Sequence, residues 1–349
     1  MAVNGPLQRP KNGPVPDAMP RAILHIGFHK TATSWFQTAV YPRSTSHRLI
    51  DRDLVRGVFM DSDAFDFDAA EARARLRLDE GLLAPLLCEE ELSGVLHIGA
   101  ASTFIAKEVA SRLHATLPDA QVVIFVREQI DAAASWYLQY LKEGGTASAR
   151  RYLFADEYLF PGRFMLFKTP RFDFSQLDYA GLIATYDSLF GRENVHVFAY
   201  EDLAGDSAAL LAEMEQRLGL SLADSGSAAR RVNRAYRRGI IPLARAANLF
   251  TGRQVANKRT LLHLPFWYRM RWEILERLNA SALFGGRPEA GALIGKAASD
   301  WIGRRFARSN AWLARRMDRD LGAIGYSVDS SGDQPDLPKR TPLLRWTRK

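Results

Sequence analysis

The stretch AILHIGFHKTATSW, residues 22–35, decides the fold. It begins with a short apolar run that contains β-branched residues, and the run ends in a polar turn, as is typical of a buried strand. The residues that follow, TSWFQTAVY at 33–41, have the apolar spacing of a helix. The stretch therefore predicts a strand, a loop and a helix in succession.

Three later segments repeat this pattern. Apolar runs that predict strands occur at GLLAPLLC (81–88), AQVVIFVR (120–127) and VHVFAY (195–200). Helical patterns cover residues 103–117, 130–145 and 176–190. Strands that alternate with helices of this length are typical of βαβ units. We therefore predict an α/β fold of three layers, with a central, mainly parallel sheet flanked by helices.

The two ends of the chain differ in composition from the middle. Residues 1–20 contain five prolines among glycines and polar residues, which predicts a disordered tail. Residues 331–349 are basic and follow a loop-like segment, so we expect a flexible, solvated tail. One domain is expected over residues 21–330, with a helical C-terminal part from about residue 207.

The composition limits the class of protein. A chain of 349 residues with 47% hydrophobic residues can bury a sizeable core. No apolar stretch approaches the roughly 20 residues that span a bilayer, and no secretory signal is visible before Ala22, so we expect a cytoplasmic protein. The single Cys88 excludes an intramolecular disulfide and a zinc site made of thiolates.

The formal net charge of +8 indicates an anionic partner. Nucleic acids, nucleotides, acidic glycans and anionic membranes all satisfy this charge. Choosing between them requires a local motif.

The turn after the first predicted strand has the residues of a phosphate-binding loop. Ligands of parallel sheets bind beyond the carboxyl ends of the strands, where loops lead into helix N-termini. A helix that begins near Thr33 offers unpaired backbone N–H groups, and Lys30 adds a full positive charge. Thr31, Thr33 and Ser34 add hydroxyl donors, and the small Ala32 lets the backbone approach an anion.

An ordinary turn is the alternative. In that case Lys30 is exposed to solvent, and Thr33 or Ser34 caps the helix. The turn is not a Walker A loop, because no Gly precedes the Lys in the required pattern.

The segment HKTATSW, residues 29–35, resembles the PKSGTTW loop of the sulfotransferases that use 3'-phosphoadenosine 5'-phosphosulfate (PAPS). It is more similar still to the HKTGT form of bacterial members. The resemblance implies that Lys30 and residues 31–34 bind the 5'-phosphosulfate, and that Lys30 stabilises charge on the bridging oxygen. Ala32 replaces the usual Gly, which is tolerated unless the backbone there needs a positive φ.

A second anion site is expected for the 3'-phosphate, which remains in the product adenosine 3',5'-bisphosphate (PAP). Arg127 closes the strand at 120–127, and Ser135 follows eight residues later in the next predicted helix. The family has an Arg and a Ser at this spacing, and both side chains donate to phosphate oxygens. Taken alone, Arg127 suits a strand-end ion pair and Ser135 a helix surface. The two motifs in the right order favour the phosphate site.

Arg237 and Arg238 are further candidates for the 3'-phosphate. With Gly239 they occupy roughly the place of the basic loop that closes over this phosphate in cytosolic sulfotransferases. The Gly-Asp-Trp that follows in that family is absent, and a solvated helix start is the alternative.

The acidic turn in LLCEEELSG, residues 86–94, is the main candidate for the catalytic base. A base must lie beside the group that is transferred, within reach of the acceptor proton. The turn follows the second predicted strand and resembles an acidic segment of bacterial sulfotransferases, in which Glu90 takes the position of the base. A shift of one residue would give this role to Glu89 or Glu91, and a solvated acidic turn is the alternative.

Two histidines and a group of aromatic residues are further candidates for the site or the core. His29 is the second candidate for the base, because imidazole titrates near neutrality. His25 lies within the strand pattern and is expected in the core. The aromatic side chains between residues 136 and 152 are expected either to pack in the core or to form a stacking wall for a sugar: Trp136, Tyr137, Tyr140 and Tyr152.

The resemblance covers most of the chain, including residues 179–203 and 306–321. It implies a P-loop-type fold and a bacterial sulfotransferase that moves the sulfuryl group of PAPS to a hydroxyl or amine acceptor, foremost on a carbohydrate or glycolipid. No metal ion and no nucleic acid are expected to take part. A peripheral membrane contact is expected if the acceptor is a lipid.

Two other functions stay open. A small-molecule kinase of P-loop architecture would need a Mg²⁺ site, and the sequence offers no Walker B acid for it. A basic nucleic-acid-binding protein would need basic and aromatic residues along a groove, and residues 266–278, FWYRMRWEILERL, contain both kinds.

Overall fold

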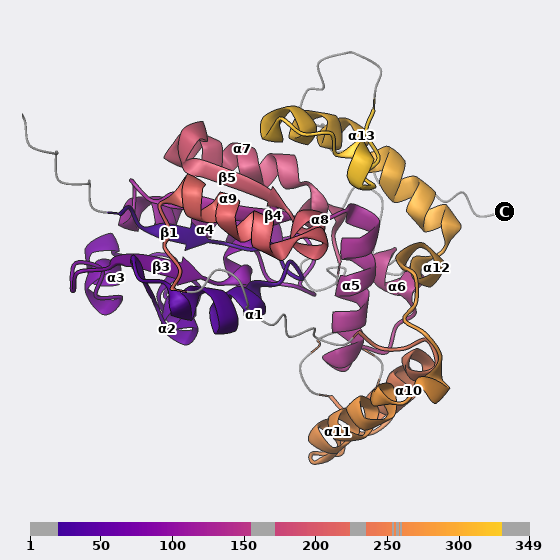
Figure 1. The fold of residues 1–349 in the computed structure, drawn as a ribbon. Coiled ribbons are helices and arrows are strands. Elements are labelled where there is room, and N and C mark those ends of the chain that lie inside the picture. Colours follow the sequence, from indigo (N-terminus) through magenta and orange to yellow (C-terminus); the bar gives the residue numbers. More distant parts are fainter. Residues whose placement is uncertain are drawn as a thin grey trace, which may run out of the picture.

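A five-stranded sheet lies at the centre of the protein in a computed structural model, which describes residues 20–154, 172–223, 235–252, 255, 258 and 260–329. The strands are β1 (Ile23–His25), β2 (His47–Leu49), β3 (Ala84–Cys88), β4 (Gln121–Val126) and β5 (Val195–Ala199). Their order is β2-β3-β1-β4-β5, and every neighbouring pair is parallel. Helices flank the sheet (Figure 1), so the predicted P-loop-type α/β fold is confirmed.

The helices before β5 are α1 (Thr33–Trp35), α2 (Arg52–Phe59), α3 (Ala69–Arg75), α4 (Ala101–Thr116), α5 (Gln129–Lys142), α6 (Ala149–Leu153) and α7 (Tyr179–Phe190). Those after β5 are α8 (Tyr200–Gly205), α9 (Ser207–Leu218), α10 (Ile240–Ala247), α11 (Trp267–Ala280), α12 (Ala290–Ile294) and α13 (Lys296–Met317). None of the described helices is both long and apolar enough to cross a membrane. The expected tails at 1–19 and 331–349 lie outside the described residues.

The sheet separates two hydrophobic cores because successive side chains of a strand point to opposite faces. In β4, Val122 and Ile124 enter one core, while Val123 and Phe125 enter the other. The first core includes side chains of α4, α5, α7 and α13, and the second includes α9 and the helical segment after β1. Both faces are therefore covered, which explains why the strands read as continuous apolar runs.

Some elements differ from the prediction. The helix after β1 begins at Thr33 as expected, but only three residues are α-helical before a π-helical segment at Phe36–Val40. The helix predicted over 176–190 begins at Tyr179 and is preceded by a 3₁₀ turn. The sequence analysis missed β2, α2 and α3 altogether.

The strand order creates a crevice between β1 and β4. The chain leaves β1 towards β2 on one side of the sheet, and it leaves β4 towards β5 on the other side. Loops that diverge in this way open a binding crevice beyond the strand ends. The loops that border the crevice carry Lys30 and Arg127, so the fold brings together the two motifs singled out in the sequence.

Helix α13 braces one of these loops. The amide groups of Asn310 and Gln129 exchange two hydrogen bonds of 2.6 and 3.0 Å, and both side chains are buried. Ser309 donates to Asp178 at the start of α7, at 2.8 Å. The start of α5, directly after Arg127, is therefore held in place from the far end of the sequence.

Candidate functional site

The turn after β1 has an unusual backbone. Lys30 and Ala32 both have positive φ, 63° and 70°, in the left-handed region. The Thr31 hydroxyl donates to the carbonyl of Phe28, and the carbonyl of Ala32 accepts from the backbone N–H of Trp35. The replacement of Gly by Ala32 is therefore unfavourable, because the backbone at this position does take a positive φ. Gly adopts this conformation without strain, whereas for Ala it costs about 1 kcal/mol.

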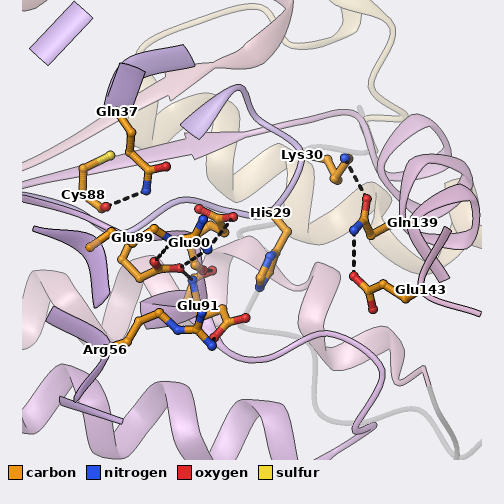
Figure 2. Close-up of polar contacts among 12 residues, drawn as sticks. His29, Lys30, Gln37, Arg56, Cys88, Glu89, Glu90, Glu91, Gln139 and Glu143 are labelled. Carbon is orange, nitrogen blue, oxygen red and sulfur yellow. Dashed lines mark hydrogen bonds and ion pairs between the residues drawn. The ribbon is translucent and has the colours of Figure 1, made fainter. Parts of the chain in front are cut away.

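The side chain of Lys30 is turned towards α5 rather than into solvent. Its Nζ donates to Oε1 of Gln139 at 3.2 Å (Figure 2). Burial lowers the pKa of Lys30, and the nearby charges of Lys142 and Arg127 lower it further, while Glu90 opposes the shift. No side chain caps α1, whose N-cap is Ala32. The alternative of an exposed lysine beside a Thr33 or Ser34 cap is therefore wrong.

Two buried donors at this turn have no hydrogen-bond partner. They are the hydroxyl of Thr33 and Nε of Arg127, and Thr33 is only 4% exposed. A buried donor without a partner costs about 1–3 kcal/mol. An anion is the kind of acceptor that both donors lack, and its charge would offset that of Lys30. The donor set therefore fits a phosphate or sulfate group.

Arg127 lies directly beside the turn. Its Nη1 donates to the carbonyl of Lys30 at 3.2 Å, and its guanidinium lies over the ring of Tyr200 at 4.6 Å. Asp131 is 3.8 Å from Nη2 of Arg127. The alternative of an ion pair at the end of the strand is therefore present, but the pair is weak. The arginine is thus oriented by a carbonyl and an aromatic ring while part of its donor set stays open.

Ser135 and Gln139 lie one turn apart on α5. Residues at this spacing share a face of a helix, so Ser135 is on the face that meets Lys30. Its side chain is partly buried. Lys30 therefore meets the face of α5 that carries Ser135, and Arg127 contacts the backbone of Lys30.

The three glutamates after β3 have different partners. Glu89 is fully buried, forms an ion pair with Arg52 and accepts a hydrogen bond from the backbone N–H of Glu91. Glu91 pairs with Arg56 at 2.8 Å (Figure 2). Both carboxylates therefore anchor the turn to α2.

Glu90 has a buried carboxylate oxygen without a hydrogen-bond partner. Its Oε1 lies 3.3 Å from Nη2 of Arg52, while its Oε2 is buried without a hydrogen-bond partner. Gly27 lies against it: a Cβ at Gly27 would be 3.1 Å from the Cα of Glu90, so the end of β1 approaches the acidic turn closely. Among the described residues Glu91 also keeps an oxygen without a partner, but that of Glu90 is buried and lies next to the end of β1.

His29 is a buried neutral imidazole. Burial lowers its pKa to about 4, and its Nε2 lies in hydrogen-bond contact with the carbonyl of Gly94, to which a neutral ring donates. His25 is also fully buried, stacks on Phe125 and has a pKa lowered to about 3 by burial, so its expected place in the core is confirmed.

A polar chain that the sequence analysis missed leads away from Lys30. Gln139 donates to Glu143 at 2.7 Å, and Glu143 lies 3.2 Å from Nε2 of His97. The other nitrogen of His97 contacts the hydroxyl of Tyr152 at 2.9 Å. The four-residue spacing of Ser135, Gln139 and Glu143 was the available signal for it.

The remaining candidates lie elsewhere. Arg237 donates to the carbonyls of Asn279 and Gly285 at 2.9 and 2.6 Å, and Arg238 is exposed. Their contact with the 3'-phosphate stays a prediction. The four aromatic residues are at most 2% exposed and belong to the core, so the stacking wall is wrong: Trp136, Tyr137, Tyr140 and Tyr152. Within the described ranges, no cluster of three or more His, Cys, Asp or Glu could hold a metal ion.

Comparison with known proteins gives a match in structure but not in sequence. No protein-family model and no curated protein matches the chain. The crystal structure of a sulfotransferase from Alicyclobacillus acidocaldarius matches with a TM-score of 0.51 and 16% identity, over 88% of this chain and 98% of that one. Mouse sulfotransferase SULT7A1 in complex with PAP has a TM-score of 0.32 and 14% identity, over 77% of this chain and 88% of that one. The chain therefore has the fold of the Alicyclobacillus sulfotransferase.

Proposed function

We propose that the protein is a PAPS-dependent sulfotransferase. The observation that carries the proposal is that Thr33 and Arg127 each have a buried donor without a partner among the described residues, while Lys30 between them in the site has its Nζ bound to the amide of Gln139 and to no carboxylate of those residues. Buried donors without partners next to a cation are typical of an anion-binding site. The sulfotransferase fold and the resemblance of residues 29–35 to the PAPS loop select phosphosulfate among the anions.

The residues of the Lys30 turn would hold the 5' end of PAPS. When bound, PAPS supplies the activated sulfuryl group. Lys30 neutralises charge at the leaving oxygen, and the hydroxyls of Thr33 and Ser34 with the backbone N–H groups of 31–34 bind the 5'-phosphate. Arg127 and Ser135 bind the 3'-phosphate. The burial of Lys30 strengthens its charge contacts.

Glu90 is the proposed base. Its unpartnered Oε2 can accept the acceptor proton, whereas the oxygens of Glu89 are engaged by Arg52 and by a backbone N–H. His29 is less suited to the role because its imidazole has a pKa of about 4 and is a weak base. A base of this kind acts best when the site excludes water.

The acceptor is proposed to be a hydroxyl group of a carbohydrate or glycolipid, as the family resemblance implies. Sulfuryl transfer relies mainly on alignment of the two reacting groups and on neutralisation of charge. The Lys30 turn therefore supports the nucleotide site, whereas the class of acceptor rests on the family resemblance.

Titration calorimetry with PAP tests the nucleotide site. Wild type should bind PAP with micromolar or tighter affinity, and Lys30→Ala and Arg127→Ala should each weaken it, while Lys107→Ala, an exposed lysine on α4, should not. Transfer of labelled sulfate from PAPS to a panel of glycans then tests the reaction. Binding of ATP with Mg²⁺ in place of PAP would overturn the proposal and favour the kinase.

A further inference from the structure

The excess positive charge of the chain is concentrated in one segment. Residues 235–287 contain ten Lys and Arg residues and only two acidic residues, Glu273 and Glu276, a net charge of +8. The rest of the chain has 37 basic and 37 acidic residues and is neutral. This segment, here called the α10–α11 projection, extends beyond α5 on the side away from the sheet (Figure 1).

Helix α11 in this projection buries two polar side chains beside Leu275 and exposes several apolar ones together with Arg269, Glu273 and Arg277. Arg271 and Asn279 are 1% and 2% exposed, whereas Phe266, just before the helix, is 65% exposed and Trp272 is 49% exposed. A helix that only separates a core from water has the opposite arrangement. The outer face of α11 therefore combines exposed apolar side chains with charged ones.

The buried polar residues account for this orientation. Arg271 donates to the carbonyl of Lys142 at 3.0 Å, at the C-terminal end of α5, where a cation is favoured by the helix dipole. Asn279 accepts from the backbone N–H of Arg237 at 2.7 Å and donates to the carbonyl of Ala235 at 3.2 Å. These contacts fix which side of α11 faces inward.

Exposed apolar side chains are concentrated in the projection. Of the 14 strongly exposed large hydrophobic side chains in the described part of the chain, nine lie in the projection: Leu243, Phe250, Leu261, Leu262, Phe266, Met270, Trp272, Ile274 and Leu283. Phe266, Met270 and Ile274 follow one another at four-residue spacing and form one stripe. Arg269 and Arg277 are exposed beside this stripe.

We propose that the α10–α11 projection docks on an anionic membrane surface. Apolar and aromatic side chains flanked by arginines match the boundary between acyl chains and charged headgroups, into which such faces insert. Each basic residue near the surface adds attraction to anionic lipids. A second copy of the chain is the poorer occupant, because its projection would bring a net charge of +8 against another of the same sign.

Docking would also place the Lys30 turn near the lipid. Gln139, which binds Lys30, and Lys142, whose carbonyl binds Arg271, lie three residues apart on α5. An acceptor carried by a lipid would then be presented close to Lys30. This consequence rests on the proposed function, whereas the docking itself does not.

Vesicle flotation without nucleotide tests the docking. Wild type should bind vesicles of phosphatidylcholine and phosphatidylglycerol more strongly than vesicles of phosphatidylcholine alone, and added salt should weaken the binding. The triple variant Phe266→Ser, Met270→Ser, Ile274→Ser should lose about tenfold or more in affinity. Arg269→Glu with Arg277→Glu should abolish the preference for the anionic vesicles.

The control is a triple variant with apolar residues elsewhere that are at least as exposed: Phe65→Ser, Leu82→Ser and Phe104→Ser. It should float like wild type, and circular dichroism should show all variants folded. The proposal is overturned if wild type does not float with anionic vesicles, or if the control variant loses as much as the α11 variant. It is also overturned if sedimentation shows a dimer that only the α11 triple variant dissociates and no vesicle binding is seen. PAP binding is measured separately, so failure here leaves the nucleotide site untouched.

Discussion

Arg127 and Arg237 are both candidates for the 3'-phosphate, and their surroundings differ. Arg127 has a buried Nε without a partner and holds the carbonyl of Lys30 at 3.2 Å. Arg237 donates from Nε and Nη1 to two backbone carbonyls at 2.9 and 2.6 Å. The first guanidinium has a buried donor left for a ligand, while the second uses its Nε and Nη1 to join chain segments. An open donor set is thus a better guide to a binding residue than charge alone.

Glu90 and Glu89 differ in the same way, because one has an oxygen without a partner and the other has both oxygens engaged. Substitution of Glu90 gives the largest expected effect, a loss of kcat. Glu90→Gln should lower kcat by about 10²–10⁴-fold, because the base for the acceptor proton is lost. Glu89→Gln should instead lower the free energy of unfolding by about 2 kcal/mol, because its carboxylate pairs with Arg52 and caps the turn. Steady-state kinetics and denaturant unfolding of both variants separate the roles. Equal losses of activity in two stably folded variants would remove the contrast.

Arg127→Ala and Arg237→Ala compare the two arginines directly. Arg127→Ala should weaken PAP binding by about 100-fold, or about 2.7 kcal/mol, because a charged bidentate donor is removed. Arg237→Ala should leave PAP affinity unchanged and reduce the free energy of unfolding by about 1–3 kcal/mol, since its carbonyl partners lose their donor. Calorimetry with PAP measures the first quantity and denaturant titration the second. A loss of PAP affinity in Arg237→Ala would restore it as a phosphate ligand.

His29, like Glu89, is a buried group whose hydrogen bond is already made, here to the carbonyl of Gly94. Its pKa is about 4 in the folded protein and 6.5 ordinarily, so between these values the unfolded chain binds a proton that the folded chain does not. Stability must therefore fall as pH falls through this window, by about 1.4 kcal/mol per pH unit from this residue. His29→Gln should reduce the slope of unfolding free energy against pH by that amount. Loss of activity in this variant at neutral pH, with PAP binding intact, would instead indicate that His29 is the base.

Ala32→Gly has the smallest expected effect. A glycine relieves the positive φ of 70°, which should stabilise the turn, while the unfolded chain gains entropy. We expect the relief of strain to exceed the entropy cost, with a net gain in unfolding free energy of about 0.5–1 kcal/mol. Thermal and denaturant unfolding measure it, with exposed Ala246→Gly in α10 as the matched change that should destabilise. A loss of stability at both positions would show that Ala32 is not strained.

The sequence alone predicted the layered fold because four of the strands are continuous apolar runs. Helices cover both faces of the sheet, so nearly every strand residue is apolar and the signal is strong. Strand β2 escaped prediction because its residues, HRL, include only one apolar side chain, and the strand exists through its pairing with β3. The left-handed backbone of Ala32 was also hidden, since a positive φ at Ala has no sequence signal of its own.

The Lys30 turn and Arg127 were determined as candidates by the sequence, because a strand end followed by a cation and a helix is a local pattern. Only the tertiary structure decided the rest of the site. The pairing of Lys30 with Gln139, the different partners of the three glutamates and the exposed apolar stripe of α11 all depend on residues distant in the chain. Local sequence determines which groups are present, but their free donors and acceptors are known only when the packed chain has satisfied the others.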